Sequence, residues 1–247
     1  MPQKNFYIEN DNYTRIVEKQ DEHSFFKYVD FIIKLSRGKK NILDVGCGTG
    51  IALKLFLKKK KKSNIYGIDI SKTSIQKCKK RGLNCWVYDG IIIPFRDDYF
   101  DLVCSHNVLE HVENPKKFLD EKYRVLRRGG YLIVVCPNFL SITTNFHSHT
   151  AGFKQKTKNL LDIFIKTFSS DCKLKKMETV NRENFHSDDD ARNVTNPQDI
   201  LKWAKTHKLK LIYWSSHSVY KKGLINFLDS SFFRVFFGSL FMVFKKR

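Results

Sequence analysis

Apolar residues follow two different periods along the first half of the chain. Between residues 10 and 37 they recur at spacings near three and four, which predicts a helix that stops at Gly38. Five shorter β-rich runs predict strands, at residues 41–45, 64–70, 85–88, 100–105 and 131–136. Helical patterns lie between most of these runs. Because strands that alternate with helices form parallel sheets with right-handed crossovers, the pattern predicts an α/β fold.

Capping residues indicate where two of these helices begin and end. Ser71 directly follows the second strand and is expected to cap the next helix. Asn114 is expected to cap a later helix that has Pro115 at its first position. The pair Gly129-Gly130 is expected to end that helix near Arg127, because glycines commonly terminate helices.

The second half of the chain is less regular. Residues 139–190 contain no clear strand, although 153–168 combine lysines with apolar residues. A helix is expected after Pro197, and strands are expected at 210–214 and 239–244. The expected fold is therefore a doubly wound, mostly parallel seven-stranded sheet with helices on both faces, Rossmann-like in class, with an antiparallel last strand.

The chain is expected to form a single domain over residues 1–247, because no repeat or low-complexity linker interrupts it. With 42% hydrophobic and 28% charged residues, it has the composition of a globular protein. Its expected parts are an N-terminal helical segment (1–40), an α/β core (41–138), a basic insertion or lid (139–190) and a C-terminal part (191–247) with a helix, the last strands and an aromatic, basic tail.

The net charge of +20 comes mainly from lysine, with five consecutive charges at Lys58–Lys62. Such a basic surface favours nucleic acid, anionic lipid or an acidic partner, but a solvated lysine-rich surface explains it equally well. The six cysteines include no CxxC pair, so reduced, mostly buried thiols and no zinc site are expected. The polar residues after Met1 do not resemble a secretory signal, which favours a cytoplasmic protein.

A glycine-rich stretch, Asp-Val-Gly-Cys-Gly-Thr-Gly from Asp44 to Gly50, lies between a predicted strand and a predicted helix. Its glycines let the backbone approach a ligand closely at a helix N-terminus. Asp69 ends the next strand, where a carboxylate accepts hydrogen bonds from ribose hydroxyls of NAD or S-adenosylmethionine. Asp89 ends the third strand, where a carboxylate can bind the exocyclic amine of adenine. Acids at three successive strand ends favour the methyl donor over a dinucleotide.

These motifs, in this order, resemble the class I S-adenosylmethionine-dependent methyltransferases of the UbiE/UbiG-like (type 11) group. The resemblance covers residues 41–138, about two fifths of the chain. The matching segments are ILDVGCGTG, YGIDIS, the Asp89-Gly90 pair, FDLV, VLEH followed by Asn-Pro, and RVLRRGGYL. The resemblance implies an enzyme that transfers a methyl group from S-adenosyl-L-methionine.

The resemblance also implies how the cofactor is held. The glycine loop would face its methionine part, with Asp44 supporting the amino end. Asp69 would bind ribose, Asp89 would lie near adenine, and the backbone of His106 would lie near the sulfonium. The complete set of implied cofactor-binding residues is Asp44, Gly46, Cys47, Gly48, Gly50, Asp69, Ile70, Asp89, Gly90 and His106.

The segment after the fourth strand departs from this group. The ubiquinone-pathway O-methyltransferases that the chain resembles carry a Glu-x-x-Glu-His metal-binding pattern there, whereas this chain has Asn107, Glu110 and His111. One carboxylate and one imidazole hold a divalent ion weakly, so no metal is expected. His111 and Glu110 are the candidate catalytic residues, as general base for a hydroxyl acceptor, and a structural role in the turn is the alternative.

The acceptor is indicated by two basic, apolar segments. Residues 153–176 and the last 21 residues combine lysines with aliphatic and aromatic residues. They fit a basic surface helix on anionic lipid, but a helix packed on the sheet or over the active site is slightly favoured, because apolar faces are normally part of a core. Leu224–Phe244 is long enough to suggest a transmembrane helix, but Asp229 and Arg234 argue against one. A small-molecule or lipid-linked acceptor is therefore expected.

Three alternatives stay open. The charge suggests an RNA methyltransferase, although base N-methylating enzymes usually carry Asn/Asp/Ser-Pro-Pro-Tyr/Phe where this chain has Ser105-His-Asn-Val108. A non-catalytic membrane-surface or interaction protein with the same fold is the second, and the intact strand-end acids argue against it. The third is a metal cluster in the insertion, formed by His147, His149, His186 and Asp188.

Overall fold

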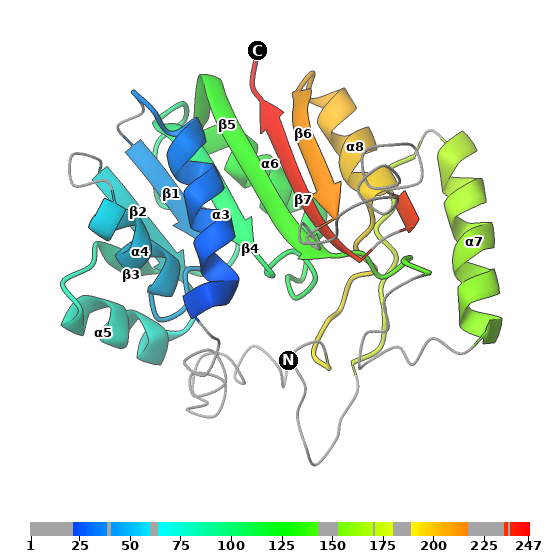
Figure 1. Cartoon of the computed structure of the whole chain (residues 1–247), viewed down its shortest axis with the longest axis horizontal. Coiled ribbons are helices and arrows are strands. Elements are labelled where there is room, and N and C mark those ends of the chain that lie inside the picture. Colours follow the sequence, from blue (N-terminus) through cyan, green and yellow to red (C-terminus); the bar gives the residue numbers. More distant parts are fainter. Residues whose placement is uncertain are drawn as a thin grey trace. The chain divides into compact units, whose positions relative to one another are not determined.

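The computed structural model describes residues 22–38, 41–59, 64–142, 153–169, 171–179, 189–216, 235–236 and 238–247. Seven strands of these residues form one sheet in the order β3-β2-β1-β4-β5-β7-β6, so the predicted α/β fold is confirmed (Figure 1). The strands are β1 (Asn41–Val45), β2 (Asn64–Asp69), β3 (Cys85–Val87), β4 (Phe100–His106), β5 (Leu126–Pro137), β6 (Lys210–Ser216) and β7 (Ser239–Lys245). The helices are α3 (Glu22–Leu35), α4 (Ile51–Lys59), α5 (Lys72–Lys80), α6 (Pro115–Val125), α7 (Phe153–Phe168) and α8 (Pro197–Thr206).

The chain divides into two compact units. Unit 1 holds the described residues up to His106, together with Lys117–Leu132 and Lys246. Unit 2 holds Asn107–Lys116, the described residues from Ile133 to Lys245, and Arg247. The division falls inside β5, and the predicted single-domain organisation stays a prediction.

Unit 1 contains the parallel strands around β1. This strand is parallel to both β2 and β4, and Asp44 lies opposite Gly67 on one side and Cys104 on the other. Parallel strands end at the same edge of a sheet, so the glycine-rich loop after β1 and Asp69 at the end of β2 meet there. In Figure 1, α3 lies in front of the sheet and α6 lies behind β5.

The core of unit 1 comes from β1 and α4. Ile42, Leu43 and Val45 of β1 have no exposed surface, and Leu53 and Phe56 of α4 are likewise fully buried. Burying an apolar side chain of this size stabilises a fold by about 1.5–3 kcal/mol. This apolar packing supports the glycine-rich loop, because the loop connects these two elements.

One predicted cap is found in the structure, and a second helix has a cap that was not predicted. The Ser71 hydroxyl accepts a hydrogen bond from the N–H of Ser74 at 3.2 Å, which caps α5. Asn196 caps α8 by accepting from the N–H of Asp199 at 2.9 Å, and Pro197 occupies the first turn. Each cap satisfies a donor that the helix itself leaves unpaired.

The prediction for Gly129-Gly130 was wrong. The helix α6 already ends at Val125, and β5 continues from Leu126 through both glycines. The N–H of Gly129 donates to the carbonyl of Lys246 at 2.8 Å, and a Cβ atom on Gly130 would lie 2.8 Å from the carbonyl oxygen of Arg127. These glycines therefore permit close backbone approach inside a strand rather than ending a helix.

The prediction of six reduced thiols was wrong for two of them. Cys78, in the last turn of α5, and Cys85, at the start of β3, form a disulfide with a Cα–Cα distance of 6.3 Å. Cys47, Cys104 and Cys136 are free and buried, and Cys172 is half-buried. The pairing depends on how α5 turns back towards β3, which the spacing of cysteines alone does not reveal.

Unit 2 contains the antiparallel pair β6 and β7, as predicted for the last strand. The helix α7 packs through Ile163 against Leu140 and Val235. The segment that follows α7 forms one isolated antiparallel bridge, between Lys176 and Asn193.

Several predicted features lie outside the described residues. They are the first part of the N-terminal helix (residues 10–21), Lys60–Lys62, the candidate metal cluster His147, His149, His186 and Asp188, and the part of Leu224–Phe244 that precedes Val235. Among the described helices, none is long and apolar enough to cross a membrane.

Candidate functional site

The glycine-rich loop, Asp44–Gly50, leaves β1 and leads directly into α4. Gly46, Gly48 and Gly50 have φ angles of 78°, 53° and 81°, which residues with a side chain rarely adopt. The N–H groups of Gly46 and Cys47 donate to the carbonyl of Ile68 at 2.8 and 3.1 Å, which ties the loop to β2. The loop thus presents bare backbone at the carboxyl edge of the sheet.

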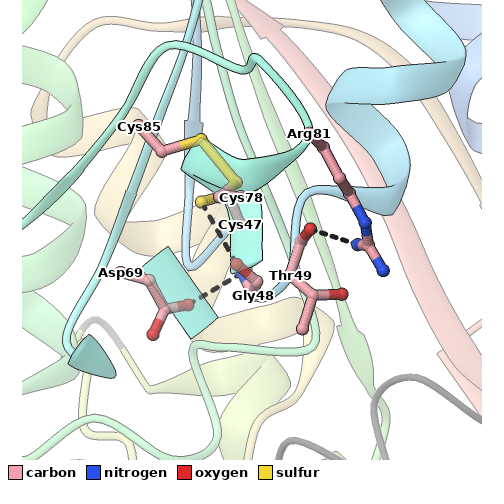
Figure 2. Close-up of a disulfide and its surroundings, with 7 residues drawn as sticks. All are labelled: Cys47, Gly48, Thr49, Asp69, Cys78, Arg81 and Cys85. Atoms are coloured by element: carbon pink, nitrogen blue, oxygen red, sulfur yellow. Dashed lines mark hydrogen bonds between the residues drawn. A yellow bond between two sulfur atoms is a disulfide. The ribbon is translucent and has the colours of Figure 1, made fainter. Parts of the chain in front are cut away.

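The carboxylate of Asp69, at the end of β2, links the glycine-rich loop to the start of α5. One carboxylate oxygen accepts from the N–H of Gly48 at 2.8 Å (Figure 2). The other accepts from the N–H of Ser71 at 2.9 Å. Burial raises the pKa of Asp69, while the hydrogen bonds from Ser71 and Gly48 act in the opposite direction. Because a carboxylate oxygen has two lone pairs, Asp69 can accept further hydrogen bonds from a pair of hydroxyls.

Asp44 is a buried carboxyl in the middle of the sheet. Its Oδ1 lies 3.7 Å from the Cys104 thiol, which donates to it. Burial raises the pKa of Asp44 to about 7, and the Cys104 hydrogen bond and the positive charge of Lys122 lower it. A carboxylate in such a place is stabilised by a cationic ligand, since desolvation disfavours its ionised form.

Asp89, Gly90 and Ile70 gather where β3 ends. Asp89 is exposed, and its Oδ1 accepts from the N–H groups of Ile91 and Ile92, both at 2.8 Å. A Cβ atom on Gly90 would lie 3.1 Å from Cγ2 of Ile70. The exposed carboxylate of Asp89 therefore lies close to the apolar side chain of Ile70 and to the backbone of Gly90. This combination suits a flat base that carries an amino group.

His106 ends β4, and its ring centroid lies 5.1 Å from that of Tyr28 in α3. With His106, all the residues predicted for the cofactor belong to unit 1. The individual contacts assigned to them with the cofactor stay predictions. Tyr28 was missed because its contact with His106 joins segments almost eighty residues apart.

The two candidate catalytic residues belong to unit 2, where a third residue joins them. Nδ1 of His111 lies 3.2 Å from Oδ1 of Asp190, and Nε2 lies 3.7 Å from Oε1 of Glu110. Burial lowers the pKa of His111 to about 4, although 17% of its side chain stays exposed. Burial also raises the pKa of Asp190 to about 7. His111 is therefore a neutral imidazole near pH 7, and the Asp190 carboxyl lies beside its Nδ1.

The turn that carries His111 is held by a distant segment. The N–H groups of Arg192 and Asn193 donate to the carbonyl of Glu110 at 2.7 and 3.0 Å. The Asn193 side-chain amide donates to the carbonyls of Leu109 and Val112 at 3.1 and 2.7 Å. These bonds fix the backbone around His111 from a segment that begins the C-terminal part of the chain.

Asp190 was not among the predicted site residues. It belongs to an acidic triplet that is visible in the sequence, but nothing in the spacing connects it to a histidine 79 residues earlier. Arg81, which donates to the carbonyl of Thr49 in the glycine loop at 2.5 Å, was missed for a similar reason. Both contacts exist only because the fold brings distant segments together.

Comparison with known proteins agrees with this geometry. Residues 43–134 match the family described as methyltransferase domain. An uncharacterised protein of Methanocaldococcus jannaschii is 36% identical over 126 residues, which cover 50% of this chain and 58% of that protein. The mitochondrial ubiquinone biosynthesis O-methyltransferase of Dictyostelium discoideum is 32% identical over 121 residues, covering 41% of this chain and 37% of that protein. The chain therefore spans little more than half the length of the first of these relatives and less of the second.

Among solved structures, geranyl diphosphate C-methyltransferase from Streptomyces coelicolor, in complex with Mg²⁺, geranyl diphosphate and S-adenosyl-L-homocysteine, has a TM-score of 0.58 to this chain. The identity is 12%, over 97% of this chain and 85% of that one, so this match shows a shared fold. The strand order, the glycine-rich loop and the sequence matches agree on both the fold and the cofactor. Residues 43–134 therefore form a methyltransferase domain of the class I, S-adenosyl-L-methionine-dependent type.

Proposed function

We propose that this protein transfers a methyl group from S-adenosyl-L-methionine to a small-molecule or lipid-linked acceptor. The observation that carries the proposal is the row of carboxyl groups Asp44, Asp69 and Asp89 on three strands of unit 1, beside the glycine-rich loop. Their chemistry fits a cationic nucleoside. Asp44 is buried with a raised pKa and is stabilised by an ammonium group, whereas Asp69 keeps lone pairs for ribose hydroxyls.

When bound, the cofactor supplies a methyl group that its sulfonium already activates. The chain's own contribution is mainly to orient the two reactants, which accounts for much of the rate of such a transfer. For a hydroxyl acceptor, His111 is the base that takes the proton, because its imidazole is neutral near pH 7. Oδ1 of Asp190 lies 3.2 Å from Nδ1 of that imidazole, and Nε2 is the nitrogen that we propose accepts the proton.

The helix α7 supports an acceptor of apolar character. Three residues at helical spacing hold its inner face to the rest of unit 2. The Asn159 amide donates to the carbonyls of Phe139 and Ser141, Ile163 is buried, and Lys166 pairs with Asp199. The opposite face is therefore directed away from the residues that anchor the helix.

That outer face is apolar where a surface helix is ordinarily polar. Leu161, Phe164, Ile165 and Phe168 are 60%, 63%, 54% and 76% exposed. Residues spaced three and four apart lie on one face of a helix, and the rings of Phe164 and Phe168 are 5.0 Å apart. An exposed apolar stripe of this size, in a chain with net charge +20, fits contact with an anionic lipid surface.

On this basis, we propose a cytoplasmic protein that contacts anionic membranes peripherally through α7 and takes a lipid-linked acceptor there. A relative is named for ubiquinone biosynthesis, which agrees with an acceptor of this class. The test is to incubate the protein with methyl-labelled S-adenosyl-L-methionine and, separately, lipid extract, polar metabolites and RNA. Label is expected in the lipid or metabolite fraction. Label in RNA alone would establish the nucleic-acid alternative instead.

Membrane contact is tested separately with vesicles of anionic phospholipid at low salt. The wild-type protein is expected to co-sediment, and Phe164→Ser with Phe168→Ser is expected to lower the bound fraction several-fold, because it removes most of the aromatic stripe. Ile212→Ser is the matched control, since Ile212 is 42% exposed on β6 and lies outside α7. Equal sedimentation of the wild type and the double variant would contradict the role of α7.

A further inference from the structure

Three sulfur atoms meet directly beneath the glycine-rich loop. Cys78 and Cys85 form the disulfide, and the Sγ atoms of these residues and Cys47 all lie within 4.8 Å of one another (Figure 2). All three residues are buried, at 0%, 2% and 8% exposure. Cys47 belongs to the loop itself, whereas the disulfide joins α5 to β3. These two elements follow Asp69 and precede Asp89, respectively.

The disulfide is in close contact with the loop backbone. A Cβ atom on Gly50 would lie only 2.5 Å from Sγ of Cys78, so no side chain fits between the loop and the sulfur. On the other side, a Cβ atom on Gly67 would lie 2.7 Å from Sγ of Cys47. The sulfur cluster therefore fills the space between the glycine-rich loop and β2 without leaving room for displacement.

A hydrogen bond also links the disulfide-bonded segment to the loop. Arg81 lies between the two cysteines in sequence, and its guanidinium donates to the carbonyl of Thr49 at 2.5 Å (Figure 2). The segment from Lys79 to Asn84 that the disulfide closes thus holds the glycine-rich loop through Arg81. A change in the conformation of this segment therefore acts directly on the glycine-rich loop.

We propose that the Cys78–Cys85 disulfide is a reversible redox-modification site that sets the affinity of the glycine-rich loop for its cofactor. The inference rests on the proposed function, because it concerns the same cofactor. A dithiol reductant supplies two electrons and two protons, so that the disulfide becomes two thiols and the reductant becomes a disulfide. A small-molecule disulfide oxidant takes the two electrons back and leaves as two thiols, which restores the bond.

Packing determines the direction of the effect. Bonded sulfur atoms lie about 2.0 Å apart, whereas nonbonded heavy atoms stay about 3.5–4.0 Å apart. Reduction therefore forces the two sulfur atoms away from each other in a region where Gly50 is already in contact with Cys78. The loop backbone has to move, and the conformation that fits the cofactor loses population. The oxidised protein binds the cofactor more tightly.

Two features make the site both accessible and specific. Most residues between the cysteines, such as Lys80 and Gly82, are exposed, so local opening of this short segment admits a small reductant. Burial and the nearby carboxyls of Asp69 and Asp44 raise the pKa of Cys47 well above its usual value. Cys47 stays a protonated thiol and a poor nucleophile, so the bond is kept between Cys78 and Cys85.

The test measures S-adenosyl-L-homocysteine binding by calorimetry on the full chain after treatment with oxidised or reduced dithiothreitol. Peptide mapping with alkylation assigns the disulfide in each sample. The dissociation constant is expected to be at least about fivefold higher for the reduced protein. Cys78→Ala with Cys85→Ala is expected to remove the difference, whereas Cys172→Ser, a half-buried free cysteine of unit 2, is expected to keep it.

Three other outcomes would overturn the inference. Equal, measurable affinity in both redox states would overturn the redox site and leave the proposed function intact. Absence of cofactor binding in both states would overturn the two together. Binding of one zinc equivalent by the three thiols, with no disulfide formed by the oxidant, would assign the cluster as a metal site instead. Cys47→Ala, which keeps the disulfide, is expected to retain the redox response.

Discussion

The two units build their sites from residues at very different distances along the chain. In unit 1, Asp69 accepts a hydrogen bond from Gly48, 21 residues earlier, and from Ser71, two residues later. In unit 2, the turn around His111 is held by Asn193, more than 80 residues away. The predicted cofactor site is thus built from strands, loops and helices that follow one another in the chain. The position of the candidate base, His111, depends on a segment far away in the chain.

This difference indicates that the two units contribute to different steps, cofactor binding and turnover. A strand followed by a glycine-rich loop and a helix makes its binding geometry locally, so different relatives can share it while their insertions differ. The residues that hold the turn around His111, Asp190 to Asn193, lie beyond the family match at residues 43–134. Substitutions in unit 1 should therefore change cofactor affinity, and substitutions around His111 should change turnover.

The largest effect is expected for His111→Ala. Loss of a general base typically slows a reaction about 100-fold or more, so kcat towards a hydroxyl acceptor should fall by this factor. The dissociation constant for S-adenosyl-L-homocysteine should stay within about twofold, because no predicted cofactor residue is altered. His207→Ala, at the end of α8, serves as the control histidine. A kcat near that of the wild type would establish a structural role for His111.

Asp69→Ala should weaken cofactor binding by about tenfold or more. The substitution removes the acceptor for the Gly48 and Ser71 N–H groups and for ribose, and hydrogen bonds to charged groups contribute about 1.5–3 kcal/mol each. Calorimetry with S-adenosyl-L-homocysteine measures the change. Asp171→Ala removes an exposed carboxylate of unit 2 that pairs with Lys173 and should have no effect. An unchanged affinity for the Asp69 variant would contradict the ribose assignment.

A pH effect of intermediate size is expected from Asp44. With a pKa of about 7, this carboxyl is mostly protonated at pH 6 and half ionised at pH 7. If it pairs with the ammonium group of the cofactor, affinity should rise roughly fivefold over this interval. Calorimetry at several pH values should show the rise in the wild type and a flatter profile for Asp44→Asn. Parallel pH profiles for the two proteins would contradict the prediction that Asp44 pairs with the ammonium group of the cofactor.

Stability provides a second measurement of the same pKa. Between about pH 4 and 7, the folded protein keeps a proton on Asp44 that the unfolded chain has lost, so this group lowers the free energy of unfolding as pH rises. The lowered pKa of His111 acts with the opposite sign between about pH 4 and 6.5. The difference between wild type and Asp44→Asn isolates the Asp44 contribution in denaturant titrations.

The smallest effect is expected from removing metal ions. The turn itself offers one carboxylate, Glu110, where the ubiquinone-pathway pattern has two. Among the described residues, the ligand atoms of Glu110, His111 and Asp190 do not form a group close enough to hold a metal ion, so EDTA should change the rate of methyl transfer by less than about twofold. Assays with and without excess Mg²⁺ provide the comparison. Strong inhibition by EDTA that Mg²⁺ reverses would show that Glu110 and His111 act with a metal ion.

Local patterns predicted most of unit 1. The run Asn41–Val45 is a strand, Ser71 is a cap, and the acids Asp69 and Asp89 follow the second and third strands as expected. Each depends on interactions within a few residues or on a short apolar period. The same local reasoning was wrong for Gly129-Gly130, which was expected to end a helix. These glycines instead make room for neighbouring backbone atoms inside a strand.

The sequence by itself determined the α/β alternation, the glycine-rich loop and the positions of Asp44, Asp69 and Asp89, since each follows from residue type and short spacing. Tertiary structure alone decided that Asp190 contacts His111 and that Cys78 and Cys85 meet beneath Gly50. The physical reason is that such contacts depend on how elements pack in three dimensions. Chain separation carries no record of that packing.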